Sequence, residues 1–163
     1  MYTRFGKVFH FISILVFIFA LLYSYAALSD MVAYEVGDRG EAVKLIGKSQ
    51  FFYSGILIFL LLNILIATPA KLIEYQYSAS IKRLFPKGDI YRDYLLAWLY
   101  SFIGIINISL AIMVLFVHRI NNPYEIEPAK FAFFFYIVPV FFVVWVVGLV
   151  YIGYKKFQEV SKK

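Results

Sequence analysis

Four long apolar stretches, separated by shorter polar segments, make up most of this chain. They cover residues 8–28, 51–67, 95–117 and 131–152. A helix rises 1.5 Å per residue, so about 20 residues cross a hydrocarbon core of about 30 Å. The pattern therefore predicts an all-α membrane protein, in which residues 1–163 form a single domain of four transmembrane helices.

The longest polar interval, Pro69 to Asp93, lies between the second and third stretches and divides the chain into two predicted helical hairpins. Thr68 and Pro69 suit the cap and first position of a new helix, and Asp89 suits the cap of the third span. Within the interval, apolar residues recur at helical spacing, and these are Ile73, Tyr77, Ile81, Leu84 and Phe85. This spacing predicts a helix over about 70–85 that lies on the membrane surface with one face in the headgroup region.

Lysine and arginine are unevenly distributed among the polar segments. The N-terminus, the central interval and the C-terminal tail hold eleven of these residues, whereas the other two segments hold five. Because positive charge accumulates on the cytoplasmic side of membrane proteins, we expect both termini and the central interval to be cytoplasmic. Residues 29–49 and 118–130 then face outward, and the protein is expected to be a multi-pass protein of the cell's inner (cytoplasmic) membrane.

The composition narrows the class of protein further. Hydrophobic residues make up 63% of the chain and charged residues only 16%, which excludes an ordinary soluble domain. The net charge of +6 comes from residues in the gaps between apolar stretches, so we expect no nucleic-acid partner. Cysteine is absent, which excludes disulfides and thiol chemistry, and no nucleophile, zinc or phosphate-loop motif is present. We therefore expect neither an enzyme nor a cofactor.

The polar residues inside the spans give few candidates for chemistry. No Asp, Glu, Lys or Arg lies in any of the four stretches, which counts against an ion-coupled transporter. His10 is predicted near the inner start of the first span and His118 at the outer end of the third. Haem bound by both histidines of one chain is thus excluded, and we expect no metal site.

Asn63 and Asn107 are the strongest polar groups within the stretches, and a buried carboxamide needs a hydrogen-bond partner. Counted from the inner ends of their stretches, the two differ in depth by roughly 10 Å, so we expect them not to pair with each other. Asn63 and Asn107 are instead candidates for helix association, each bonding a neighbouring helix or subunit, and the alternative is that either lines a ligand pocket. Gly104, Asn107 and Ala111 fall on one stripe of the third span, at spacings of three and four. We expect this stripe to be a helix contact, either with spans two and four or with a partner.

The segment after the first stretch carries a sequence resemblance. Within it, the run EAVKLI is expected to form about one and a half helical turns that end at Gly47, and Ser49 suits the N-cap of the second span. Leu28–Lys48 resembles the outer-loop segment of the SdpI-like immunity proteins and their uncharacterised membrane relatives, over 21 of 163 residues. The matching positions are Leu28, Asp30, Val32, Gly40 and Lys48.

The segment departs from that family's pattern at several polar positions: Ser29 replaces a proline, Glu35 a histidine, Gly37 an asparagine and Val43 an aspartate. The resemblance implies a non-enzymatic membrane protein that protects against, or senses, a membrane-active toxin.

Two hypotheses for function follow. The first is an interaction protein, an accessory subunit, scaffold or immunity-like factor, that acts by helix association with other membrane subunits or with itself. The alternative is a lipid- or quinone-handling component of a membrane redox or transport complex. The abundance of aromatic residues, 18 Phe and 14 Tyr, is compatible with packing in the bilayer or with a groove for an isoprenoid tail.

Overall fold

The computed structural model describes residues 2–36, 42–122 and 129–161. The described helices are α1 (Tyr2–Ala27), α2 (Lys48–Tyr75), α3 (Ala79–Leu84), α4 (Ile90–Asn121) and α5 (Ala129–Ser161), and the strands are β1 (Met31–Val36) and β2 (Ala42–Gly47). Within these residues, four helices are long and apolar enough to cross a membrane: α1, α2, α4 and the Tyr136–Ser161 part of α5. The four predicted long apolar helices are thus confirmed, and a small β-hairpin is added to them.

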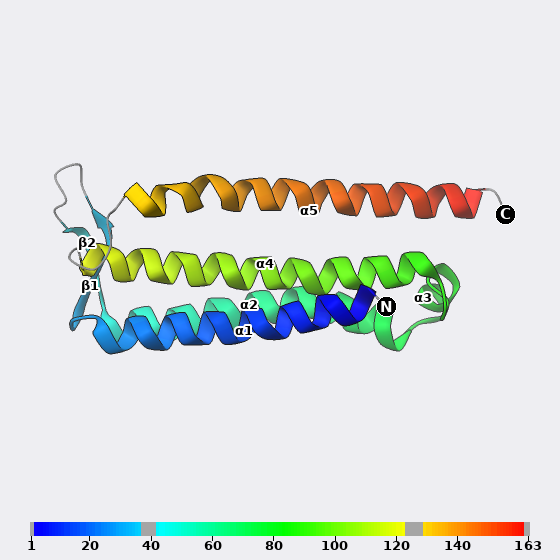
Figure 1. The fold of residues 1–163 in the computed structure, drawn as a ribbon. Coiled ribbons are helices and arrows are strands. Elements are labelled where there is room, and N and C mark those ends of the chain that lie inside the picture. The colour runs from blue at the N-terminus through cyan, green and yellow to red at the C-terminus, as the bar shows by residue number, and fades with distance from the viewer. Residues whose placement is uncertain (1, 37–41, 123–128, 162–163) are drawn as a thin grey trace.

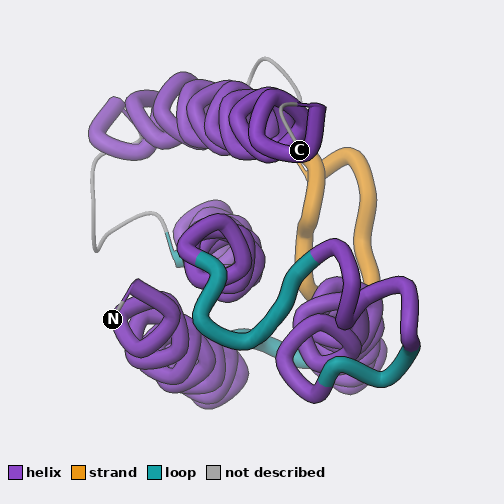
Figure 2. Tube along the Cα trace, turned by 90° about the vertical axis from the view of Figure 1, so that its right-hand side faces the viewer, coloured by secondary structure: helices purple, strands orange, loops and turns teal. Residues whose placement is uncertain are grey.

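The long helices lie side by side with their axes roughly aligned, and the chain runs in alternating directions through them (Figure 1). The two strands lie at one end of the bundle, whereas α3 and the described ends of the chain lie at the other end. Viewed down the bundle, α4 is central, with α1 and α2 on one side and α5 on the other (Figure 2). The principal neighbour of α1 is therefore α4, and not α2, which follows α1 in the sequence.

The core consists of two apolar clusters. The cluster nearer the hairpin contains Phe17, Ala20, Leu21, Phe59, Ala111 and Val114. The cluster nearer α3 contains Ala70, Leu96, Leu99, Tyr100 and Ile103. Glycine allows α1 and α4 to approach closely, because a Cβ atom at Gly6 would lie 2.8 Å from the backbone oxygen of Ala97. Such contact is the usual means of association for helices in lipid, where hydrophobic drive is absent.

Helix α2 does not end with its apolar stretch. It continues through Thr68 and Pro69 to Tyr75, so the predicted helix start at Thr68–Pro69 is wrong. The Thr68 hydroxyl donates to the Ile64 carbonyl at 2.7 Å, as expected for a threonine inside a helix. The residue after Tyr75, Gln76, is the C-cap: it adopts left-handed backbone angles (φ 54°) and donates its N–H to a carbonyl of the last turn.

The break at Gln76 also corrects the predicted surface helix. Residues 70–75 belong to α2, and α3 is a separate helix of six residues, capped by Ser78. Ile73 packs against the apolar cluster nearer α3, whereas Tyr77 is 81% exposed and Leu84 is 50% exposed. The five residues assigned to one helical face, including Ile81 and Phe85, therefore do not share a helix.

The segment after α1 is a hairpin, so the predicted helical turns in EAVKLI are wrong. Ala42–Gly47 pairs antiparallel with Met31–Val36. A helix of this length is marginal in water, and in this run the neighbouring strand β1 satisfies the backbone groups instead. Helix α2 begins at Lys48 with Gly47 as its N-cap and not Ser49, whereas the predicted cap Asp89 is confirmed by a 2.9 Å bond from the Tyr91 N–H.

Candidate functional site

A layer of polar side chains connects α1, α2 and α4 between the two apolar clusters. Asn63 Nδ2 donates to Asn107 Oδ1 at 2.7 Å, and Asn107 Nδ2 donates to Ser13 Oγ at 3.0 Å. His10 Nε2 lies 3.0 Å from Asn63 Oδ1, and the Ser13 hydroxyl donates to the His10 carbonyl. Asn107 and Ser13 are fully buried. The strongest polar groups of the spans are therefore used to join three helices of one chain.

The expectation that Asn63 and Asn107 do not pair is wrong. It measured depth from the end of the apolar stretch at residue 67, but α2 continues to Tyr75. Asn63 lies twelve residues before Tyr75, and Asn107 lies seventeen residues after Ile90, where α4 begins. The ends of the apolar stretches therefore do not give the relative depth of the two side chains, which depends on how far the packed helices are displaced along each other.

The stripe on α4 is a helix contact within the chain. Gly104, Asn107 and Ala111 are all buried. A Cβ atom at Gly104 would lie 2.5 Å from the ring of Phe9, and Ala111 belongs to the same apolar cluster as Phe17. The stripe thus faces α1 and α2, whereas the expected neighbours within the chain were the second and fourth spans, α2 and α5. Because its residues are buried, the stripe is not exposed to a partner.

A second polar cluster, centred on Glu74, lies near the α3 end of the bundle. The Glu74 carboxylate accepts hydrogen bonds from Lys7 and from the Tyr100 hydroxyl (2.7 Å), and pairs with Lys71 at 3.4 Å. The Arg92 guanidinium donates to the Glu74 carbonyl at 2.8 Å. Glu74 therefore ties α1, α2 and α4 together. The sequence analysis missed this role, because it placed Glu74 on a surface helix and nothing in the local sequence points to Lys7.

The matching residues of the outer-loop segment have mainly structural contacts. Leu28, which precedes the hairpin, and Val32 of β1 are both buried. The Asp30 carbonyl accepts the Lys48 N–H at 2.9 Å, and Lys48 Nζ lies 4.7 Å from the centroid of the Tyr25 ring. Gly40 lies outside the described residues. The described residues of the segment thus serve to form the hairpin and to hold it against the helices.

Helix α5 packs chiefly against α4. Two indole groups make this contact, since Trp98 Nε1 donates to the Trp145 carbonyl at 2.7 Å and Trp145 Nε1 donates to Ser101 Oγ at 3.0 Å. Towards the hairpin, α2, α4 and α5 border an apolar crevice of about 600 Å³. Its walls include Phe51 and Ser54 of α2, Ser109 and Met113 of α4, and Val138 of α5. The crevice is therefore an apolar opening in the transmembrane part of the bundle.

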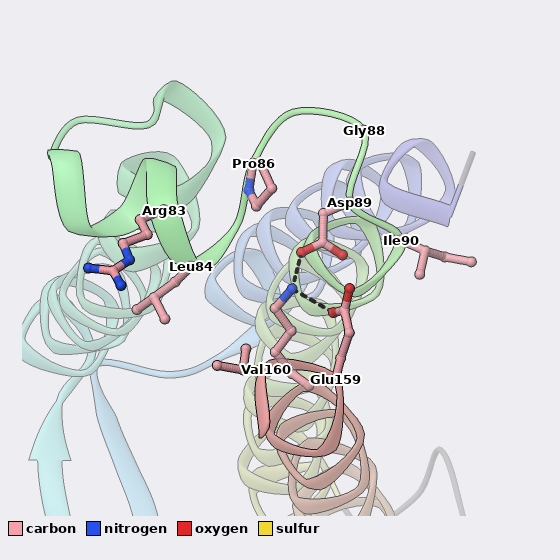
Figure 3. A pocket seen from close by; sticks show the side chains of 9 residues that line it. Arg83, Leu84, Pro86, Gly88, Asp89, Ile90, Glu159 and Val160 are labelled. Atoms are coloured by element: carbon pink, nitrogen blue, oxygen red, sulfur yellow. Dashed lines mark hydrogen bonds and ion pairs between the residues drawn. The ribbon is translucent and has the colours of Figure 1, made fainter. Parts of the chain in front are cut away.

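A cavity of about 730 Å³ lies at the opposite end of the bundle, between α3 and the end of α5 (Figure 3). Lys156 forms ion pairs there with Asp89 and with Glu159, the latter at 2.8 Å. Arg83 also lines the cavity. This opening is thus lined by charged side chains, in contrast to the apolar crevice at the other end.

The two histidines lie far apart in the bundle. His10 belongs to the polar layer, and the His118 ring lies 4.9 Å from that of Tyr23 in the half nearer the hairpin. Among the described residues, no three side chains of the His, Asp or Glu type gather where a metal ion would bind.

Comparison of this chain with protein families, with curated proteins and with solved structures finds no match.

Proposed function

We propose that this protein is a non-enzymatic, multi-pass protein of the inner (cytoplasmic) membrane that acts by associating with another membrane protein. The observation that carries the proposal is the placement of α5, which packs chiefly against α4 and borders an apolar crevice with α2. Lipid supplies no hydrophobic drive between helices, so specific association needs close packing. The crevice offers a recess into which side chains of a partner helix would fit.

The association surface proposed here differs from the stripe that the sequence favours. Gly104, Asn107 and Ala111 are buried against α1 and α2, so a partner would reach them only by opening the bundle. The crevice, in contrast, is bordered by residues that remain partly or largely exposed, such as Met113 at 63%. Roles as an accessory subunit, a scaffold or an immunity-like factor all fit a protein that acts in this way.

The second candidate for the occupant of the crevice is a hydrocarbon chain. The volume of the crevice is the observation that favours this alternative. A helix about 10 Å wide would fill such a volume with only about five residues, so the crevice admits side chains or a lipid tail but not a whole helix. Its volume of about 600 Å³ lies within the range of small-molecule sites. The hydroxyls of Ser54 and Ser109 already donate to backbone carbonyls of their own helices, which leaves an apolar lining. A lipid- or quinone-handling role would use the crevice in this way.

Filling the crevice tests the proposal. Ser109→Phe should remove a co-purifying membrane protein after purification in mild detergent, because the new ring occupies the recess. Val143→Phe is the matched control, since Val143 is 63% exposed on α5 and does not line the crevice. Elution volume and thermal stability establish that both variants fold.

Mass spectrometry of co-purifying proteins and lipids, with an absorbance spectrum, separates the candidates. Loss of a protein partner in Ser109→Phe alone supports association. If Ser109→Phe retains every protein but loses a bound lipid, quinone or pigment, the result supports the lipid- or quinone-handling role instead. If Ser109→Phe loses neither, the crevice is not the binding site and the proposal is wrong.

A further inference from the structure

A groove on the exposed side of α2 leads from the apolar stretch towards the α3 end of the bundle. It has a volume of about 330 Å³, and its lining includes Ile64, Ala67, Thr68, Leu72 and Tyr75. The Thr68 hydroxyl is engaged by the Ile64 carbonyl, so this part of the groove offers a mainly apolar surface. Lys71 carries the charge among the described residues that line the groove.

Lys71 lies at the depth where lipid headgroups are expected. The second apolar stretch ends at residue 67, so Lys71 lies about 6 Å further along the helix. Ile64, which is 63% exposed, belongs to that stretch and therefore to the hydrocarbon region. Tyr75 and Tyr77 are 69% and 81% exposed at the other end of the groove, and such amphipathic rings favour the membrane interface. The groove thus passes from the hydrocarbon region to the headgroup region.

The polar end of the groove carries an excess of positive charge. Lys71 Nζ lies 3.4 Å from Glu74 Oε2, and Oε1 of the same carboxylate accepts a hydrogen bond from Lys7. The third donor to this carboxylate, the Tyr100 hydroxyl, is neutral. Two ammonium groups therefore share one negative charge. The side chain of Lys71 is 49% exposed, against 22% for that of Glu74, so the cation is the more accessible of the two.

We propose that this groove binds an anionic phospholipid, with the phosphate at Lys71 and one acyl chain along Ile64, Ala67 and Thr68. The excess positive charge attracts a headgroup of net negative charge, and an ammonium forms strong hydrogen bonds with phosphate oxygens. A zwitterionic headgroup would bring its own cation close to Lys71 and Lys7, which is unfavourable. The apolar part of the groove provides contact for the hydrocarbon chain.

The inference goes beyond the proposed function and does not depend on it. The crevice proposed for association lies near the hairpin, since Tyr34 and Ile46 line it, whereas this groove lies towards the α3 end of α2. The variant Ser109→Phe, which fills the crevice, should leave lipid binding in the groove unchanged.

Lipid titration tests the inference. The full chain in detergent is titrated with phosphatidylglycerol, phosphatidylcholine or phosphatidylethanolamine of the same acyl chains, and bound lipid is counted by native mass spectrometry. Phosphatidylglycerol should bind most tightly, because it alone of the three has a net negative charge. Lys71→Ala should weaken its binding about fivefold, as expected for one lysine at a membrane surface, and Lys71→Arg should preserve the preference.

Lys82→Ala is the matched control for charge, because Lys82 is exposed on α3 and does not line the groove. A second pair of variants tests the acyl-chain part. Thr68→Phe should weaken phosphatidylglycerol binding by a similar factor, because the new ring occupies the groove. Leu65→Phe should not, since Leu65 is 69% exposed on the same helix but does not line the groove. Elution volume and thermal stability establish that the variants fold.

Four results would overturn the inference. Equal binding of the three lipids would show that charge does not select the ligand. Equal losses in Lys71→Ala and Lys82→Ala would show a general attraction to surface charge. Unchanged binding in Thr68→Phe would place the acyl chain outside the groove. Displacement of the lipid by soluble glycerol 3-phosphate at equal concentration would assign the site to a free phosphate compound.

Discussion

Asn107 holds the centre of the bundle because its carboxamide meets partners from both neighbouring helices. Its nitrogen donates to Ser13 of α1, and its oxygen accepts from Asn63 of α2 at 2.7 Å. The side chain is fully buried, so water does not compete for these bonds. One residue thus fixes the relative depth of three helices.

Replacing Asn107 by leucine, which is of similar size, should destabilise the folded bundle by about 1 to 2 kcal/mol, since it leaves the Asn63 amide and the Ser13 hydroxyl without their partner. The measurement is equilibrium unfolding in mixed detergent. Ser109→Ala is the control on the same helix, because the Ser109 hydroxyl bonds only to its own backbone. Equal stability of Asn107→Leu and the wild type would show that the polar layer does not hold the helices together.

The sequence identifies the polar residues of this layer but not how they pair. Asn63 and Asn107 stand out as carboxamides within apolar stretches, and Gly104 and Ala111 mark the contact face of α4. Pairing depends on how far each helix is displaced along its neighbours, which is a property of the packed bundle. For the same reason the sequence does not reveal that Glu74 meets Lys7 across 67 positions.

At the scale of elements, one asparagine at the end of α4 joins the hairpin to the bundle by two hydrogen bonds. Asn121 Nδ2 donates to the Ala33 carbonyl at 2.8 Å, and Oδ1 accepts the Ala33 N–H at 2.9 Å. The carboxamide thus pairs with β1 as a neighbouring strand would. A two-stranded hairpin is only marginally stable alone, so its order depends on this contact and on the burial of Val32.

Asn121→Leu should therefore release the hairpin while the four long helices remain folded. We expect a loss of about 1 to 2 kcal/mol for its two backbone hydrogen bonds, seen as faster proteolysis within residues 31–47. Lys44→Ala is the control, because the exposed Lys44–Glu35 ion pair contributes little. Unchanged protease resistance in Asn121→Leu would mean that other contacts hold the hairpin.

Long elements were predictable from the sequence, whereas short ones and boundaries were not. Each long helix contains an apolar stretch of membrane-spanning length, which leaves little alternative to a helix in lipid. A run such as Ala42–Gly47 is too short for its pattern to separate helix from strand, so its partner decides. Pro69 was predicted to begin a new helix, but α2 continues past it to Tyr75.

For the whole molecule, sequence order did not predict which helices pack most closely. Successive spans were expected to pair as hairpins, but α4 lies between α5 on one side and α1 and α2 on the other (Figure 2). Close approach is decided by where small residues coincide, and Gly6 and Gly104 bring α1 and α4 together. Such coincidence becomes visible only when the two helices are placed side by side.

The distribution of charge predicts how the bundle is oriented in the membrane. The described N-terminal and C-terminal ends and α3 lie at one end of the bundle, and the hairpin lies at the other (Figure 1). Lysine and arginine concentrate in the segments at the first end, with eleven residues against five. The positive-inside rule therefore predicts that α3 is cytoplasmic and that the hairpin faces outward.

Single cysteines test this orientation directly, because the chain contains none of its own. Val43→Cys, on the exposed side of β2, should react with an impermeant thiol reagent in intact cells. Ser80→Cys, exposed on α3, should react only after the cells are permeabilised. Ile103→Cys, which is fully buried, is the control that should stay unlabelled in both conditions. Labelling of Ser80→Cys but not of Val43→Cys in intact cells would invert the orientation, so that α3 would lie outside and the hairpin in the cytoplasm.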